Sequence, residues 1–126
     1  MIKKQALPSV QILTPKVVFG FEKLREMSYT NAKNDSKYFI DFISRLRRYC
    51  QLNWNDLRTT QRHGYGTETI TVDKLKQGVQ KQTPSGLKKL LVLRSTGDNH
   101  VFLGYREKDV FQVLFIEYSF GDIYCH

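Results

Sequence analysis

The most regular hydrophobic pattern in the sequence lies in its last third, where apolar runs alternate with short polar segments. The runs are rich in Val, Leu, Phe and Tyr, and the segments between them contain turn formers. Runs of this kind are typical of neighbouring antiparallel strands. The pattern therefore predicts a C-terminal β-meander, with a short terminal strand at 122–124. The three predicted meander strands are 88–95, 100–106 and 110–118.

A helical period precedes the meander. Over residues 36–52, the spacing of apolar side chains places them in one stripe of an amphipathic helix. The residues of this stripe are Phe39, Phe42, Ile43, Leu46, Tyr49 and Cys50. Asp35 or Ser36 can cap its first turn. The pattern predicts that this stripe is buried against the meander. The expected sheet partners of the stripe are Leu91, Leu93, Val113 and Phe115.

A second, shorter helix is predicted over residues 53–63. Asn53 followed by Asp56 approximates a capping box, and Gly64 provides a stop. Because so few residues separate the two predicted helices, we expect them to pack as a hairpin, with Trp54 facing the core.

The remaining segments are less regular. Residues 10–21 are rich in β-branched side chains but contain Pro15 and Gly20, which predicts an edge strand or two short strands. Residues 67–72 alternate and predict another short strand. The polar, basic stretch 73–86 indicates a loop or a frayed helical turn.

The order of these elements predicts the fold class. A strand, two helices and then several antiparallel strands are typical of an α+β fold, with a helical hairpin packed on a twisted antiparallel sheet. A length of 126 residues is enough for one hydrophobic core and too short for two. We therefore expect a single domain over residues 1–126.

The positive charge is concentrated in the middle of the chain. Residues 45–94 contain eleven Lys and Arg against three acidic residues, so this stretch carries the whole formal net charge of +8. Such an imbalance favours a polyanionic partner, RNA or DNA, although a solvated, solubilising surface is the alternative interpretation. The candidate nucleic-acid-binding residues are Arg45, Arg48, Lys74, Lys76, Lys88 and Lys89.

Several function classes find no support in the sequence. No apolar run reaches the length of about 18 residues that a membrane span needs, and the N-terminus lacks the apolar stretch of a secretory signal. Without such a run or signal, we expect a cytoplasmic protein that does not associate with membranes. The two cysteines fit this compartment, because a single pair is not a disulfide framework. Phosphate-loop, paired-cysteine and metalloprotease motifs are absent, and the three histidines lack ligand spacing. We predict neither a metal nor a cofactor.

Ionisable side chains on the meander and the C-terminus are the candidate catalytic groups. A nuclease that works without metal needs a base near a ribose hydroxyl, cations around the phosphate and an acid for the leaving oxygen. Arg, Glu, Tyr and His supply these roles. In the alternative, structural interpretation, the arginines pair with acids across the strands and the tyrosines lie at the rim. The candidate catalytic residues are Arg94, His100, Arg106, Glu117, Tyr124 and His126.

The predicted layout and the ending Gly121-Asp122-Ile123-Tyr124-Cys125-His126 are similar to those of the RelE/ParE superfamily of bacterial toxins. The resemblance covers roughly residues 36–126. It implies a RelE-like basic toxin that cleaves messenger RNA, often on the ribosome, and is held by a small antitoxin protein. Tyr124 and His126 match the family's terminal aromatic or His, and Arg94 matches a basic residue of a central strand.

Two positions depart from the family pattern. His100 and Phe120 stand where family members have arginine. The C-terminal strands also resemble those of small uncharacterised bacterial and phage proteins. The first hypothesis is therefore a metal-independent endoribonuclease or translation inhibitor of a toxin–antitoxin pair. The alternatives are a non-catalytic nucleic-acid-binding module and a phage or host accessory protein that binds an acidic protein partner.

Overall fold

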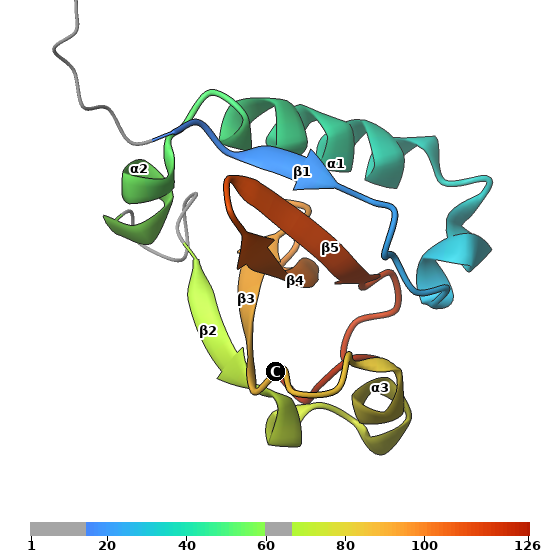
Figure 1. Cartoon of the computed structure of the whole chain (residues 1–126). Helices are drawn as coiled ribbons and strands as arrows, with labels where there is room; N and C mark the ends of the chain where they lie inside the picture. The colour runs from blue at the N-terminus through green and yellow to red at the C-terminus, as the bar shows by residue number, and fades with distance from the viewer. Residues whose placement is uncertain (1–14, 60–66) are drawn as a thin grey trace, which may run out of the picture.

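A five-stranded sheet with helices on both sides forms the centre of the molecule (Figure 1). The computed structural model describes residues 15–59 and 67–126. The strand order is β1-β5-β4-β3-β2, and the sheet does not close into a barrel. The predicted α+β class is confirmed. The strands are β1 (Val18–Gly20), β2 (Glu68–Thr71), β3 (Lys89–Arg94), β4 (Val101–Glu107) and β5 (Val110–Ile116).

The predicted meander is present as β3, β4 and β5, which pair antiparallel in sequence order. The predicted strand 67–72 is β2, which pairs antiparallel with β3. The N-terminal strand differs from the expected antiparallel arrangement because β1 runs parallel to β5, so the sheet is mixed. Most of the chain lies between β1 and β5 in sequence, which leaves the direction of β1 unconstrained by a tight turn. Residues 10–14 of the predicted first strand lie outside the described residues.

The two predicted helices begin where their caps indicate. Helix α1 (Ser36–Tyr49) is capped by Asp35, whose side chain accepts a hydrogen bond from the backbone N–H of Tyr38 at 3.1 Å. Helix α2 (Trp54–Thr59) has the reciprocal bonds of a capping box between Asn53 and Asp56, at 2.8 and 3.2 Å. The predicted residues 60–63 of this helix lie outside the described residues.

The buried stripe of α1 was predicted wrongly in part. Phe42 is buried and Leu46 packs against the core, but Ile43 is 63% exposed and Phe39 is 36% exposed. Tyr49 of the stripe is buried as expected, Cys50 is exposed, and Tyr38, which lies outside the stripe, is buried. The helix is rotated toward these tyrosines because their hydroxyls find acceptors on the sheet: Tyr38 donates to the Glu117 carbonyl at 2.7 Å, and Tyr49 to that of Arg94 at 2.8 Å.

Each face of the sheet has its own core. The α1-side core is rich in aromatic rings and combines residues of α1 and α2 with strand residues such as Leu93, Phe102 and Phe111. The α3-side core is mainly aliphatic and combines Leu90 and Leu103 with residues from the chain before and after the meander. Figure 1 shows α1 on one side of the sheet, and α3 with the C-terminus on the other.

A β-bulge moves Phe115 away from its predicted face. Gly104 pairs with Val113 while Leu103 pairs with Phe115, so Leu114 is an extra residue in β5. Phe115 therefore lies in the α3-side core and does not pack against α1. Only glycine fits at position 104, because a Cβ there would collide with the backbone oxygen of Gln112.

The segment predicted as a loop or frayed turn contains two short helices. A 3-10 helix, η2 (Val72–Lys74), precedes α3 (Gln77–Gln82), and a further 3-10 helix, η1 (Ser28–Ala32), lies before α1. Leu75 and Val79 are buried in the α3-side core, which explains why this polar stretch is ordered. The predicted terminal strand is reduced to one bridge, between Leu75 and Tyr124. In the described part of the chain, no helix has the length and apolarity to cross a membrane.

Candidate functional site

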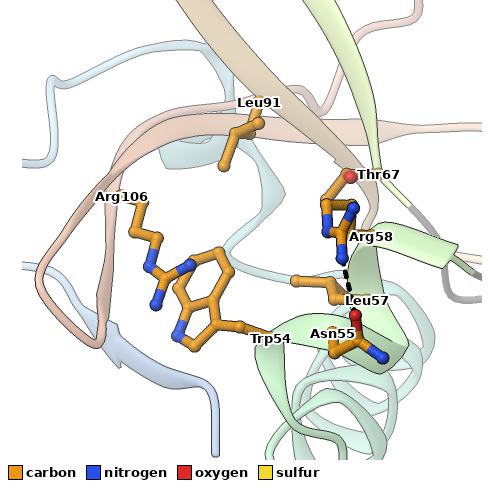
Figure 2. A pocket seen from close by; sticks show the side chains of 7 residues that line it. All are labelled: Trp54, Asn55, Leu57, Arg58, Thr67, Leu91 and Arg106. Atoms are coloured by element: carbon orange, nitrogen blue, oxygen red, sulfur yellow. Dashed lines mark hydrogen bonds between the residues drawn. The ribbon is translucent and has the colours of Figure 1, made fainter. Parts of the chain in front are cut away.

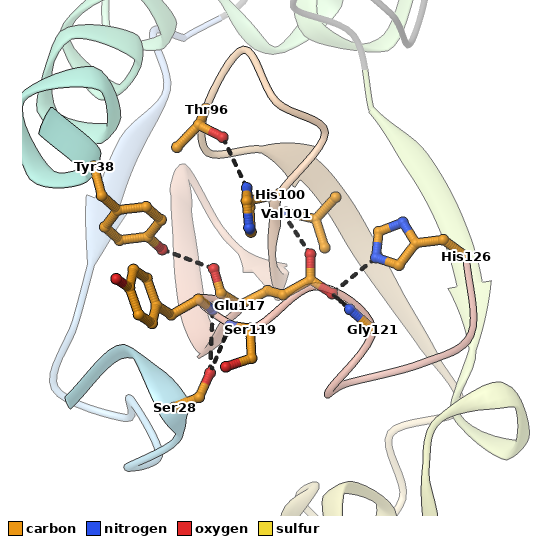
Figure 3. Close-up of polar contacts among 10 residues, drawn as sticks. Ser28, Tyr38, Thr96, His100, Val101, Glu117, Ser119, Gly121 and His126 are labelled. Atoms are coloured by element: carbon orange, nitrogen blue, oxygen red, sulfur yellow. Dashed lines mark hydrogen bonds and ion pairs between the residues drawn. The ribbon is translucent and has the colours of Figure 1, made fainter. Parts of the chain in front are cut away.

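A buried carboxylate, Glu117, lies at the centre of the candidate site (Figure 3). Glu117 follows β5, and its side chain is 0% exposed. One carboxylate oxygen accepts a hydrogen bond from the backbone N–H of Val101 at 3.2 Å, and the other accepts one from Gly121 at 2.7 Å. These bonds offset the cost of removing the charge from water. The carboxylate is therefore held in one orientation by backbone N–H groups of β4 and of the segment that follows β5.

The imidazole of His126 completes the polar centre. Its Nε2 lies 2.8 Å from Glu117 Oε2. The ring stacks between Phe120 and Tyr124, at centroid distances of 4.1 and 4.5 Å. When the imidazole is neutral and Nε2–H donates to Glu117, Nδ1 is the proton acceptor, and Figure 3 shows this nitrogen pointing away from Glu117. The His126 side chain is 18% exposed, so it remains accessible from solvent.

Two adjoining cavities lead along the β2 edge of the sheet toward this pair. The larger, of about 590 Å³, has β2 and the two lysines Lys74 and Lys76 in its walls. The smaller, of about 50 Å³, contains Arg94 and Val101. Glu68 and Tyr124 line both cavities, so the two are neighbours, and we call them together the β2 groove. Its inner end reaches Val101, whose N–H binds Glu117, and Tyr124, whose ring covers His126.

The structure brings four of the six predicted catalytic residues together. Arg94 and Tyr124 line the inner end of the β2 groove, and Glu117 and His126 form the adjacent pair. His100 lies beside this cluster: its ring contacts the edge of Phe120 at a centroid distance of 5.9 Å. The imidazole of His100, however, lines a separate polar cavity of about 340 Å³ and is bonded to Thr96 at 3.2 Å.

Arg106 lies apart from the other predicted catalytic residues. Its guanidinium lies over the Trp54 ring, 4.3 Å from the centroid, and its Nε donates to the Lys108 carbonyl at 2.7 Å. A weak ion pair of 3.9 Å joins it to Asp109. Arg106 and Trp54 both line a different cavity, which lies between α2 and the sheet and is described below.

The predicted nucleic-acid-binding residues divide into two groups. Lys74 and Lys76 are exposed at the β2 groove, and Lys88 and Lys89 are exposed at the start of β3, where Lys89 pairs with Thr71 of β2. The second group, Arg45 and Arg48, belongs to α1 on the other face of the sheet. Arg45 donates to the Arg94 carbonyl at 3.3 Å, so it supports the strand from behind the site.

Sequence reasoning missed Glu68 and Phe120. Glu68 pairs with Val92 and therefore lies at the inner end of the β2 groove. The signal in the sequence that could have indicated Glu68 is that it is the single carboxylate in the alternating run 67–72. Phe120, noted only as a departure from a family pattern, is the outer ring of the three-ring stack and is 57% exposed.

Burial also fixes the protonation state of a neighbouring tyrosine. Tyr38 donates its hydroxyl to the Glu117 carbonyl, and burial raises the pKa of Tyr38 to about 12. Tyr38 therefore stays a hydrogen-bond donor at every physiological pH, and it holds the backbone of Glu117 from the α1 side.

Comparisons with known proteins add no family to these observations. No family model, no curated protein and no solved structure matches the chain. Within residues 15–59 and 67–126, no group of three or more His, Cys, Asp and Glu side chains has the arrangement of a metal site.

Proposed function

We propose that the chain binds single-stranded RNA in the β2 groove and cleaves it without a metal ion, as a RelE-like cytoplasmic toxin. The observation that carries the proposal is the contact between buried Glu117 and His126, next to Tyr124. The Tyr124 ring stacks on His126, and Tyr124 lines the β2 groove together with Arg94, Lys74 and Lys76. An oriented base beside several cations is what cleavage of RNA through its own 2′-hydroxyl requires.

In this mechanism the neutral Nδ1 of His126 takes the proton from the ribose 2′-hydroxyl. The 2′-oxygen then forms a bond to the adjacent phosphorus, and the bond from phosphorus to the 5′-oxygen breaks. Tyr124 gives a proton to the departing 5′-oxygen, and Arg94 stabilises the charge that develops on the phosphate. The products are a 2′,3′-cyclic phosphate and a 5′-hydroxyl. Glu117 stabilises the imidazolium that forms on His126, as a buried carboxylate does in a hydrolase triad.

The features of the groove favour a single strand over a duplex. Lys74 and Lys76 are exposed and can neutralise successive phosphates. Phe120 is 57% exposed and offers a ring for stacking with an unpaired base, next to the His126 that acts on the phosphate. Backbone contacts and stacking of this kind select little sequence, so a ribosome or a folded RNA would provide the specificity.

The chemical test uses a short single-stranded RNA in the presence of excess chelator. We expect cleavage to a 2′,3′-cyclic phosphate, and no cleavage of a substrate that lacks the 2′-hydroxyl at the scissile nucleotide. The His126→Gln variant should lower the rate by about 100-fold or more, the usual range for loss of a general base. Arg47→Gln, an exposed change on α1, is the matched control and should leave the rate unchanged.

Each outcome of this test bears on the proposal. RNA binding without cleavage, with and without ribosomes, would reject the endoribonuclease and favour the non-catalytic binding module. Cleavage that His126→Gln does not affect would reject the assigned base. Cleavage that stops when the chelator is added would reject the metal-independent mechanism.

The partner side of the proposal concerns α1. Ile40 and Ile43 are each 63% exposed on this helix, next to the exposed Arg47 and Arg48. We propose that an acidic, amphipathic antitoxin covers this surface. Induced expression should then arrest growth, and co-expression of a neighbouring small acidic protein should relieve the arrest by the wild type but not by an Ile40→Glu/Ile43→Glu variant. Relief of both equally would place the partner elsewhere.

A further inference from the structure

A further cavity, of about 380 Å³, lies between α2 and the sheet (Figure 2). Its walls combine Trp54 and Leu57 of α2, Leu91 of β3 and two arginines, Arg58 and Arg106. None of these residues lines the β2 groove. The volume falls in the range of pockets that bind small molecules, so the cavity can hold a ligand independently of the proposed RNA site.

Both arginines are held in place by the protein. Arg58 donates to the Asn55 side chain at 2.6 Å, and the Arg106 guanidinium lies over the Trp54 ring, 4.3 Å from its centroid. Figure 2 shows the two guanidinium groups on opposite sides of the cavity. A cation that is already ordered loses little conformational entropy when it binds an anion, which favours affinity.

The charge balance of the cavity is positive. Among the described residues that line it, two are cationic and none carries a carboxylate. Arg106 also pairs with the Asp109 carboxylate at 3.9 Å, but Asp109 is 56% exposed, so this ion pair is weak and solvated. Apolar walls with two guanidiniums at the sides are complementary to an apolar molecule that ends in an oxyanion.

We propose that this cavity binds a small organic anion, a compact apolar body carrying one carboxylate or phosphate group. The oxyanion lies between Arg58 and Arg106, and the body packs against Trp54 and Leu91. The site is separate from the RNA-cleaving function proposed above and does not depend on it.

The chain contains its own reporter for this site, because Trp54 is its single tryptophan. The experiment titrates the full chain with phenylacetate and with phenyl phosphate, following Trp54 fluorescence and the heat of binding. Phenylacetamide has a similar body without the charge, and acetate has the charge without the body. We expect saturable binding of at least one of the two aromatic anions. Phenylacetamide and acetate should each bind with an affinity at least about 10-fold lower than that anion.

Two variants separate a built site from weak surface binding. Arg58→Gln and Arg106→Gln should each weaken binding by about 10-fold, while Arg47→Gln should change it by less than about 2-fold. A preference for phenyl phosphate over phenylacetate would identify a phosphate monoester as the natural group, and the reverse a carboxylate. The proposal is overturned if neither anion gives heat or a fluorescence change at about 10 mM, if phenylacetamide binds equally well, or if all three variants behave alike.

Discussion

The two faces of the sheet are built differently. The α1-side face is a network of aromatic rings, in which Phe102 contacts Phe42, Tyr49 and Phe111 at centroid distances of 5.3 to 6.0 Å. The α3-side face has an aliphatic core, and at its border lie a fully buried carboxylate and a polar groove. The α1-side core is thus built mainly from packed rings, and the α3-side face carries the buried carboxylate and the β2 groove beside its core.

The packed face also supports the open one. The hydroxyls of Tyr38 and Tyr49 donate to the backbone carbonyls of Glu117 and Arg94, two residues of the candidate site. The side chains of the site therefore extend from backbone that the α1 side fixes. This arrangement satisfies the general requirement that a functional site be held by a rigid surrounding layer. The comparison predicts large stability effects on the α1 side and mixed effects on stability and function at the site.

The largest effect is expected for Phe42→Ala, which removes a 5% exposed ring from the α1-side core. A cavity of this kind lowers the free energy of unfolding by about 3–5 kcal/mol. The matched change Ile43→Ala, at the next residue, should cost less than about 0.5 kcal/mol because Ile43 is 63% exposed. Chemical denaturation of both variants measures the difference. Equal losses would mean that the helix has a different rotation.

A smaller effect is expected at the border of the α3-side face. Glu117→Gln keeps the shape but replaces one acceptor oxygen with an amide NH₂, which cannot accept the bonds that Glu117 receives. We expect a loss of about 1–3 kcal/mol from unsatisfied buried donors, together with loss of RNA cleavage. Glu22→Gln, an exposed change, is the control and should be neutral. If Glu117→Gln has wild-type stability and cleaves RNA at the wild-type rate, the role assigned to Glu117 is wrong.

A pH dependence of the free energy of unfolding is expected from Tyr38, which joins the two faces. The folded chain holds the Tyr38 proton up to a pKa of about 12, whereas an unfolded tyrosine loses it near pH 10. Because the folded state binds the proton more tightly, the free energy of unfolding should fall as the pH rises from about 10 to 12. Denaturation curves of Tyr38→Phe should show a shallower decline, and those of Tyr29→Phe the wild-type decline. Identical slopes in all three proteins would show that Tyr38 is not buried as described.

Local patterns accounted for much of the fold because its strands and caps are local features. The meander, the Asp35 cap and the Asn53–Asp56 box all depend on neighbouring residues, and they are present. The rotation of α1 and the position of Phe115 depend on contacts distant in sequence. Tyr38 turns toward a carbonyl 79 positions away, and the extra residue Leu114 reverses the alternation of β5. The spacing of apolar residues in the sequence indicates neither the long-range hydrogen bond of Tyr38 nor the bulge at Leu114.

The candidate site shows the same limit. Glu117, Tyr124 and His126 were indicated by their ionisable side chains and their positions on the predicted C-terminal strands. The resemblance to the RelE/ParE superfamily also indicated Tyr124 and His126. The separation of Arg106 from this cluster follows from its position on β4, where the side chain meets Trp54. Glu68 enters the site only through the pairing of β2 with β3, which no single segment of sequence specifies.

We propose that RNA binds on the α3-side face and not on α1. The most direct test measures binding of a single-stranded RNA at several salt concentrations, in the His126→Gln background so that the RNA stays intact. Lys74→Gln/Lys76→Gln should reduce the slope of log affinity against log salt by about 1.4, because two phosphate contacts are lost. Arg45→Gln/Arg48→Gln should leave the slope unchanged. The opposite pattern, or no binding at about 50 mM salt, would contradict the account.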